Sequence, residues 1–206
     1  MKKLLITLLV CMPLAVLAQN DWELADEPKP EPEKVNPDQK YLEGAVPEVD
    51  GKVVFHTVIN APGKSADAIY EILLNYIDRM TKAKNEFENS RVVLSDPEKH
   101  EIAAYFQEWL VFKSAALSLD RTRLNFQLLV TCRDEAANVK MTRISYLYDT
   151  ERKPTAYTAE DWITDKYCVN KKHTKLLPLS GKFRRKTIDR KDFIFNKFNT
   201  LLNEKK

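Results

Sequence analysis

Basic residues gather toward the C-terminal end of the chain, where they could bind an anion. Ammonium and guanidinium groups recognise phosphates and carboxylates, so such a run could attach the protein to anionic lipid headgroups, polysaccharide or an acidic partner. In an extended strand, Lys182, Arg184 and Lys186 would share one side. A solvated basic face without a ligand is the alternative interpretation. The candidate anion-binding residues are Lys171, Lys172, Lys175, Lys182, Arg184 and Lys186.

Aromatic side chains provide a second candidate site. Tyr105, Trp109 and Trp162 could line a groove between a helix and the sheet, where an apolar ligand or a peptide would bind. Aromatic residues in strands also pack frequently in protein cores, so core packing is the alternative interpretation of the same residues.

Cys132 and Cys168 are the cysteines that follow the N-terminal segment. In an oxidising compartment they could form an intrachain disulfide. Cys132, however, shares an alternating apolar face with Leu124, Phe126 and Leu128. A buried free thiol is therefore the alternative, since two cysteines alone fix neither proximity nor geometry.

Metal and catalytic motifs are absent from the sequence. His56, His100 and His173 stand far apart, without a cysteine or carboxylate at ligand spacing. We find no nucleophile elbow, and the chain has only four glycines, which argues against a glycine-rich nucleotide site. We therefore expect no metal and no cofactor, and an enzyme with an unrecognised site remains an alternative rather than the leading hypothesis.

Residues 1–18 resemble a cleaved secretory signal peptide. Lys2 and Lys3 precede an apolar run from Leu4 to Leu17, which is short for a membrane span, and small residues precede a cut at Gln19. Acylation at Cys11 is a less favoured alternative. We expect export to the periplasm or cell surface, no transmembrane span in the mature chain, and no nucleic-acid partner. Loss of the two lysines lowers the formal net charge from +3 to about +1, which says little about partners.

Residues 19–40 alternate charged side chains with four prolines and offer almost nothing to bury. This composition predicts a disordered spacer. We expect one folded domain over residues 41–206, a length that suits a single hydrophobic core.

The pattern within this domain predicts a strand, a helix, four strands and a final helix. Residues 51–60 are rich in β-branched side chains, and from residue 66 apolar side chains recur with a helical period after the capping residue Ser65. Strand-like runs follow at 91–95, 102–113, 123–133 and 139–149. The segment 182–202 is expected to begin extended and then become helical, with Asp189 as its cap. These elements predict an α+β fold with a curved antiparallel sheet and packed helices.

Three segments resemble an exported bacterial family of unknown function with a TATA-binding-protein-like (TBP-like) fold. They are YLEGAVPEVDGKVVFHTVINAPGKSADAIYEIL, ALSLDRTRLNFQLLVTCRD and the tail that begins EDWITDKYCVNKKHTKL. The resemblance extends from about residue 41 to about residue 203 and implies the same element order as the pattern. It implies no catalytic or binding residues.

The leading functional hypothesis is a non-catalytic binding module of the bacterial cell envelope, with a protein partner or a small ligand. The first alternative is attachment to anionic envelope lipid or polysaccharide through the basic C-terminal region. The second is an enzyme.

Overall fold

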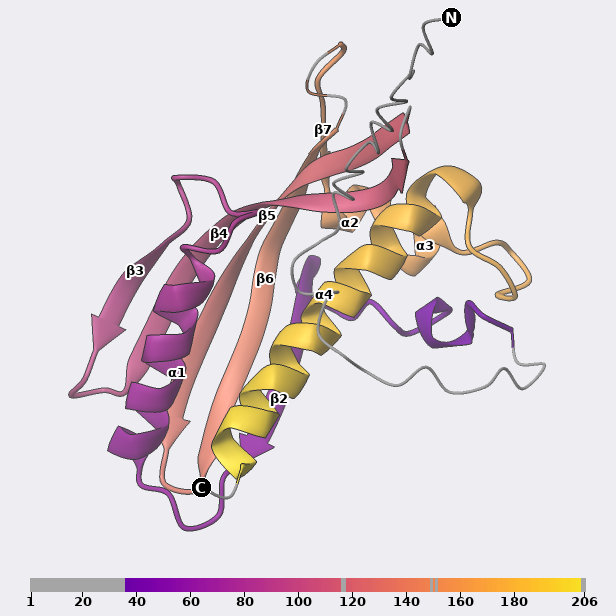
Figure 1. Ribbon diagram of the computed structural model, residues 1–206. Coiled ribbons are helices and arrows are strands. Elements are labelled where there is room, and N and C mark those ends of the chain that lie inside the picture. The colour runs from indigo at the N-terminus through magenta and orange to yellow at the C-terminus, as the bar shows by residue number, and fades with distance from the viewer. Residues whose placement is uncertain (1–35, 116–117, 149, 151, 205–206) are drawn as a thin grey trace, which may run out of the picture.

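In the described part of the chain, seven strands form one antiparallel sheet, and the two long helices lie on the same face of it (Figure 1). The computed structural model describes residues 36–115, 118–148, 150 and 152–204. The predicted signal peptide, residues 1–18, lies outside them, as do residues 19–35 of the predicted spacer. The elements are η2 (Gln39–Tyr41), β1 (Glu48–Val49), β2 (Lys52–Asn60), α1 (Ala66–Met80), β3 (Arg91–Asp96), β4 (Glu101–Ala115), β5 (Ser118–Arg133), β6 (Ala136–Tyr148), β7 (Thr155–Thr158), α2 (Ala159–Trp162), α3 (Asp165–Cys168) and α4 (Pro178–Asn203).

The sheet is built from consecutive hairpins to which β2 is added at one side. The strand order is β1-β2-β6-β5-β4-β3, and β7 also pairs with β6. Short connections in the sequence explain why β3 to β6 pair in sequence order, as predicted. The single sheet with packed helices confirms the predicted α+β class.

Helix α1 begins where the sequence predicts. The side-chain hydroxyl of Ser65 accepts a hydrogen bond from the backbone N–H of Ala68 (3.3 Å), which satisfies one of the free N–H groups of the first turn. Ile69, Leu73 and Ile77 recur on one face of the helix and are fully buried against the sheet.

Helix α4 differs from the prediction. It begins at Pro178, so the expected extended start of segment 182–202 was wrong, and Asp189 lies inside the helix rather than at a cap. Its carboxylate accepts a hydrogen bond from the Tyr41 hydroxyl (2.7 Å). Lysine and arginine are good helix formers, and proline is favoured in the first helical turn, so this basic segment is helical from Pro178 onward.

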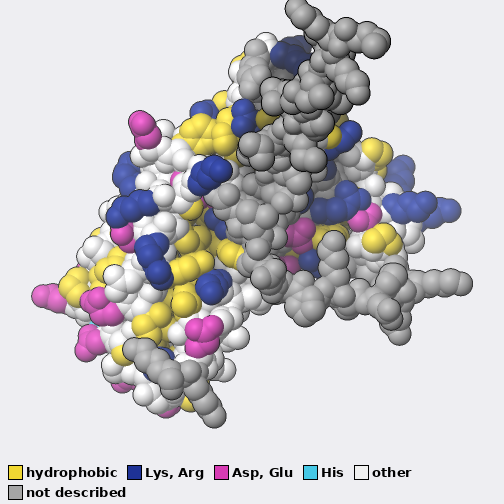
Figure 2. Space-filling model, in the orientation of Figure 1, with side chains coloured by type: hydrophobic (Ala, Val, Ile, Leu, Met, Phe, Trp, Pro, Cys, Tyr) yellow, Lys and Arg dark blue, Asp and Glu magenta, His cyan; other side chains and the backbone are white. Residues whose placement is uncertain are grey.

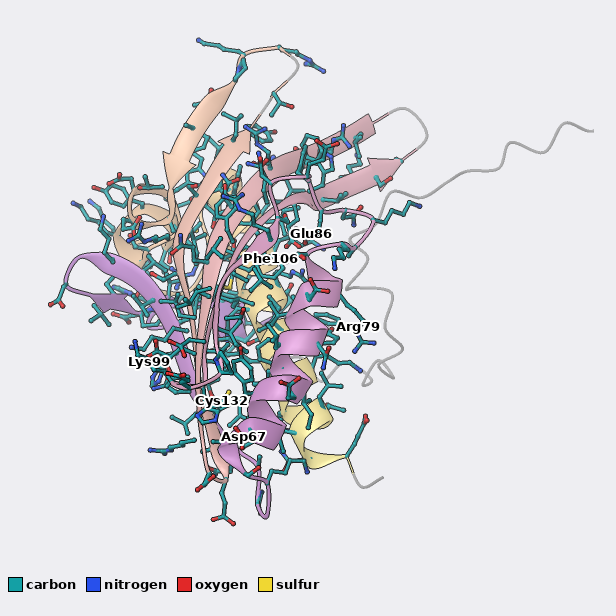
Figure 3. All side chains as sticks on the ribbon, turned by 90° about the vertical axis from the view of Figure 1, so that its left-hand side faces the viewer. Asp67, Arg79, Glu86, Lys99, Phe106 and Cys132 are labelled. Atoms are coloured by element: carbon teal, nitrogen blue, oxygen red, sulfur yellow. The ribbon has the colours of Figure 1, made fainter. Side chains whose placement is uncertain are left out.

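The core lies between the sheet and the pair of long helices. Phe106 on β4 and Phe126 on β5 stack with ring centroids 4.9 Å apart, and Phe183 and Phe198 of α4 are fully buried. Figure 3 shows both long helices on the same side of the sheet, so these two helices leave its other face, which we call the open face, uncovered. Among the described helices, none combines the length and apolar character that a membrane span requires.

Candidate functional site

The predicted basic residues do not form one surface. Lys171, Lys172 and Lys175 are exposed in the loop between α3 and α4. Lys182, on α4, donates hydrogen bonds to the Asp120 carboxylate (2.7 Å) and the Tyr148 hydroxyl (2.9 Å). Lys186 is half-buried on the same helix. Only the three loop lysines of the predicted run are therefore freely presented to solvent.

Arg184 is fully buried and binds the protein's own backbone. Its guanidinium donates to the carbonyl oxygens of Tyr41, Leu42 and Ile163, each at 2.6 Å, and to the Asp165 carboxylate, also at 2.6 Å. A buried cation needs such complete pairing, because desolvation is otherwise very costly. The predicted anion-binding role of Arg184 is wrong for the folded protein, since no part of its side chain reaches solvent.

The three predicted groove aromatics are divided between the two faces of the sheet. Tyr105 and Trp109 alternate with the core-facing Phe106 and therefore lie on the open face. Trp162, in α2, stacks on Tyr157 (3.9 Å between centroids) and lies at the edge of Phe183, on the helix-covered side. These residues therefore do not line one common groove.

Cys132 and Cys168 are both free and buried in this structure. Cys132 lies near the end of β5 in Figure 3, whereas Cys168 ends α3. Burial raises the pKa of the Cys132 thiol to about 12 and also raises the pKa of Cys168. Burial and a raised pKa both disfavour the reactive thiolate form of these side chains at neutral pH.

Part of the outer edge of β2 is unpaired. The backbone N–H of Ala61 donates to the Glu135 carbonyl (2.7 Å), so the odd-numbered residues at this end of β2 bond to β6. His56, Val58 and Asn60 then direct their backbone groups away from β6, because these directions alternate along an antiparallel strand. On the outer side, β1 covers only the first two residues of β2. The backbone groups of His56 and Val58 therefore have no strand partner within the described residues.

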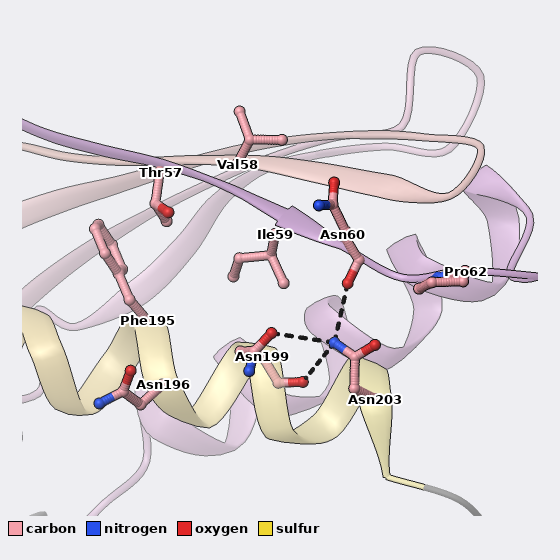
Figure 4. A pocket seen from close by; sticks show the side chains of 9 residues that line it. All are labelled: Thr57, Val58, Ile59, Asn60, Pro62, Phe195, Asn196, Asn199 and Asn203. Atoms are coloured by element: carbon pink, nitrogen blue, oxygen red, sulfur yellow. Dashed lines mark hydrogen bonds between the residues drawn. The ribbon is translucent and has the colours of Figure 1, made fainter.

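A hollow of about 450 Å³ lies between this edge and α4, and we call it the edge groove (Figure 4). Asn196, Asn199 and Asn203 recur at three and four residues, which places their amides along one side of the helix. The side-chain amide of Asn203 donates to the carbonyl of Asn60 (2.9 Å). In the described structure the Asn196 amide makes no hydrogen bond. The edge groove is lined by Thr57, Val58, Ile59, Asn60, Pro62, Phe195, Asn196, Asn199 and Asn203.

Two buried glutamates and an arginine form a cluster that the sequence analysis missed. The side chains of Glu108 on β4 and Glu86, before β3, are each only 2% exposed. Arg190 on α4 donates from Nε and Nη2 to the two carboxylate oxygens of Glu108, at 2.8 and 2.6 Å. Desolvation, and then the adjacent charge of Glu108, raise the pKa of Glu86 to about 9. Glu86 therefore holds a proton at neutral pH.

A smaller hollow of about 170 Å³ lies beside this cluster, between α1 and α4. Figure 2 shows hydrophobic side chains in a band between these helices. Tyr76, Met80 and Phe193 contribute apolar walls to the hollow. The sequence contains one signal that could have revealed this cluster. Glu108 occupies a core-facing position in the alternation of β4, between Phe106 and Leu110.

Comparison with known proteins places the chain in a family. Residues 55–147 match the family model described as Domain of unknown function (DUF4468) with TBP-like fold. A crystal structure of a DUF4468 family protein from Bacteroides ovatus is 44% identical in sequence with a TM-score of 0.75, and the match covers 82% of this chain and 96% of that chain. No curated protein matches the sequence.

A second solved structure shares the fold at lower sequence identity. A crystal structure of a TBP-like protein from Parabacteroides distasonis has 18% sequence identity and a TM-score of 0.61, and the match covers 78% of this chain and 99% of that chain. These findings confirm the predicted family resemblance and fold, whereas export and the exclusion of nucleic acid stay predictions. The chain therefore belongs to the DUF4468 family of bacterial proteins of unknown function with a TBP-like fold.

Proposed function

We propose that this protein is a non-catalytic binding module of the bacterial cell envelope that captures an extended segment of a protein partner in the edge groove. The observation that carries the proposal is the unpaired backbone at His56 and Val58, which lies beside a row of asparagine amides on α4. An exposed sheet edge is a template for another strand, because its N–H and C=O groups match those of an extended chain.

The two ends of the free edge limit the length of the captured segment. Toward the start of β2, the N–H of Val54 donates to the Pro47 carbonyl (3.2 Å). Toward its end, the amide of Asn203 occupies the Asn60 carbonyl. Only the backbone groups between these contacts are available. The geometry therefore suits a short extended segment rather than a complete additional strand of the sheet.

The opposite wall of the edge groove can recognise the other side of such a segment. Each asparagine amide offers a carbonyl acceptor and an NH₂ donor, which are the groups that a peptide backbone needs. Asn196 and Asn199 are exposed, and Phe195 adds apolar surface between them and β2. A peptide in the groove would bond to the edge of β2 through its backbone and contact Phe195 through a side chain.

The envelope location rests on residues 1–18, whose pattern predicts export. Cell fractionation of the producing bacterium tests it. We expect the mature chain, beginning at Gln19, in the periplasmic or surface fraction, and a chain without residues 1–18 in the cytoplasm. Equal distribution of the two forms would contradict export.

Selection from displayed random peptides tests the binding function. We expect the mature protein to enrich peptides whose binding is lost in Val58→Pro, because proline removes the outward N–H without taking a bond from β6. The matched control is Val93→Pro, which lies in the bulge of β3 at the opposite edge of the sheet. We expect this control to bind as the parent does. Enriched peptides that bind all three proteins equally, or no enrichment at all, would contradict the proposal.

A further inference from the structure

Arg123 presents an unsatisfied guanidinium on the open face of the sheet. The side chain lies on β5, half-buried, two residues from Arg121 on the same face. Its Nε atom is shielded from solvent and has no hydrogen-bond partner. Within the described residues, the group makes no hydrogen bond or ion pair. A shielded donor without a partner is costly in a folded protein, so its retention needs an explanation.

Aromatic rings hold this guanidinium in place. Trp109 lies directly opposite Arg123 on the neighbouring strand β4. The Phe87 ring centroid lies 5.7 Å from Cζ of Arg123 and 5.1 Å from the Trp109 centroid. The Arg121 guanidinium covers the Trp109 ring at 3.8 Å. Two cations are thus fixed beside apolar rings, where partial exclusion of water strengthens attraction for an anion.

We propose that Arg123 anchors a binding site for the carboxylate group of an acidic, uronic-acid-containing glycan. The guanidinium matches the two oxygens of a carboxylate, and its two Nη groups, unlike the shielded Nε, are the donors that an incoming carboxylate can reach. This site lies on the open face of the sheet and is separate from the edge groove.

The position of β5 favours a glycan over an acidic peptide. β5 is paired with β4 on one side and with β6 on the other, so its backbone groups are engaged. An incoming peptide would find no sheet edge here, in contrast to β2. Recognition must therefore use side chains alone. A uronic acid sugar offers a carboxylate for Arg123 and an apolar ring face for the half-buried Phe87, because Arg121 already covers the Trp109 ring.

Affinity electrophoresis of the mature protein through gels that contain a defined polymer tests this site. The probes are polygalacturonate, neutral dextran and polyglutamate. We expect retardation by polygalacturonate, weakened by added salt, and little retardation by the other two. Arg123→Gln should weaken binding to polygalacturonate by about tenfold or more, since a charge-assisted pair is lost. Arg133→Gln, an exposed position on the same face of β5, is the matched control and should change binding by less than about twofold.

Two results would overturn the inference. Equal binding by the parent and Arg123→Gln, or no retardation of the parent, would remove Arg123 as the anchor. Stronger retardation by polyglutamate than by polygalacturonate would identify an acidic peptide instead of a glycan. The thermal unfolding midpoint of Arg123→Gln distinguishes loss of the site from loss of the fold. We expect it to be unchanged or higher, because the substitution removes an unpaired cation.

Discussion

Asn203, in the last turn of α4, donates a hydrogen bond from its side-chain amide to the backbone carbonyl of Asn60, over 2.9 Å. This contact joins two residues that are far apart in the sequence and fastens the end of α4 to the outer edge of β2. It closes one end of the edge groove and leaves His56 and Val58 available. The long helix therefore both covers the core and limits the unpaired edge of the sheet.

Removal of this contact should have a modest effect on stability. Asn203→Ala leaves the Asn60 carbonyl to water, and we expect it to lower the free energy of unfolding by about 1 kcal/mol. Chemical denaturation measures the change. Asn196→Ala, on the same side of α4, removes an exposed amide that makes no hydrogen bond in the described structure and should stay within about 0.5 kcal/mol of the parent. Equal losses in the two variants would contradict a role for the contact.

Arg184 should be among the most sensitive positions of the fold. Arg184→Met removes the donors for three carbonyl groups and the partner of Asp165, so we expect a loss of about 3–5 kcal/mol in the free energy of unfolding. Arg185→Met is the matched control. Arg185 is partly exposed and pairs with Asp38, and its loss should cost about 1 kcal/mol or less. A stable Arg184→Met protein would show that these contacts contribute little.

Stability should fall as the pH rises because of Glu86. Its pKa is about 9 in the folded protein and near 4.5 when unfolded, so the folded state holds the proton more tightly between these values. The resulting stabilisation is complete below about pH 4.5 and is lost as the pH approaches about 9. We expect the thermal unfolding midpoint to decline over this interval, and Glu86→Gln to flatten the decline. Glu88→Gln, at an exposed acid, should follow the parent. If the thermal unfolding midpoint of Glu86→Gln declined as steeply as that of the parent, Glu86 would not be the cause of the pH dependence.

The thiols of Cys132 and Cys168 should be protected from alkylation only while the chain is folded. We expect Cys132 and Cys168 to resist alkylation near neutral pH in the native protein, because both are buried and have raised pKa values. In denaturant without reductant, mass spectrometry should detect two alkyl adducts. A mass lower by two hydrogen atoms, with no adducts until reductant is added, would instead reveal the disulfide that the sequence left open.

Local periodicity was sufficient to predict much of the fold. The helical repeat after Ser65 and the alternation in β5 each reflect one buried face, so they can be read without knowledge of the remaining structure. The beginning of α4 was harder to predict, because the buried face of its first turns holds Ser180, Gly181 and Arg184 instead of a regular apolar repeat. Helix α2 begins at Ala159, after the capping residue Thr158, whose hydroxyl accepts a hydrogen bond from the Asp161 N–H. The short strand β7 before it was missed.

The candidate sites depend on long-range packing and were mostly beyond sequence reasoning. Arg184 looked like a surface cation because nothing local indicates that Tyr41 and Leu42 will enclose it. The edge groove exists because β2 lies near one side of the sheet and α4 ends beside it, and neither fact has a local signature. Glu108 was the exception, since an acid at a core-facing strand position calls for a partner.

Amide hydrogen exchange at the edge of β2 tests the central claim most directly. The mature protein would be measured alone and with a saturating amount of a peptide obtained from the display selection. We expect exchange at the His56 and Val58 amides to slow by about tenfold or more when the peptide binds, because their outward N–H groups gain strand partners. The amides of β3, at the opposite edge, should be unaffected. Binding that leaves His56 and Val58 unprotected would contradict capture of an extended segment at this edge.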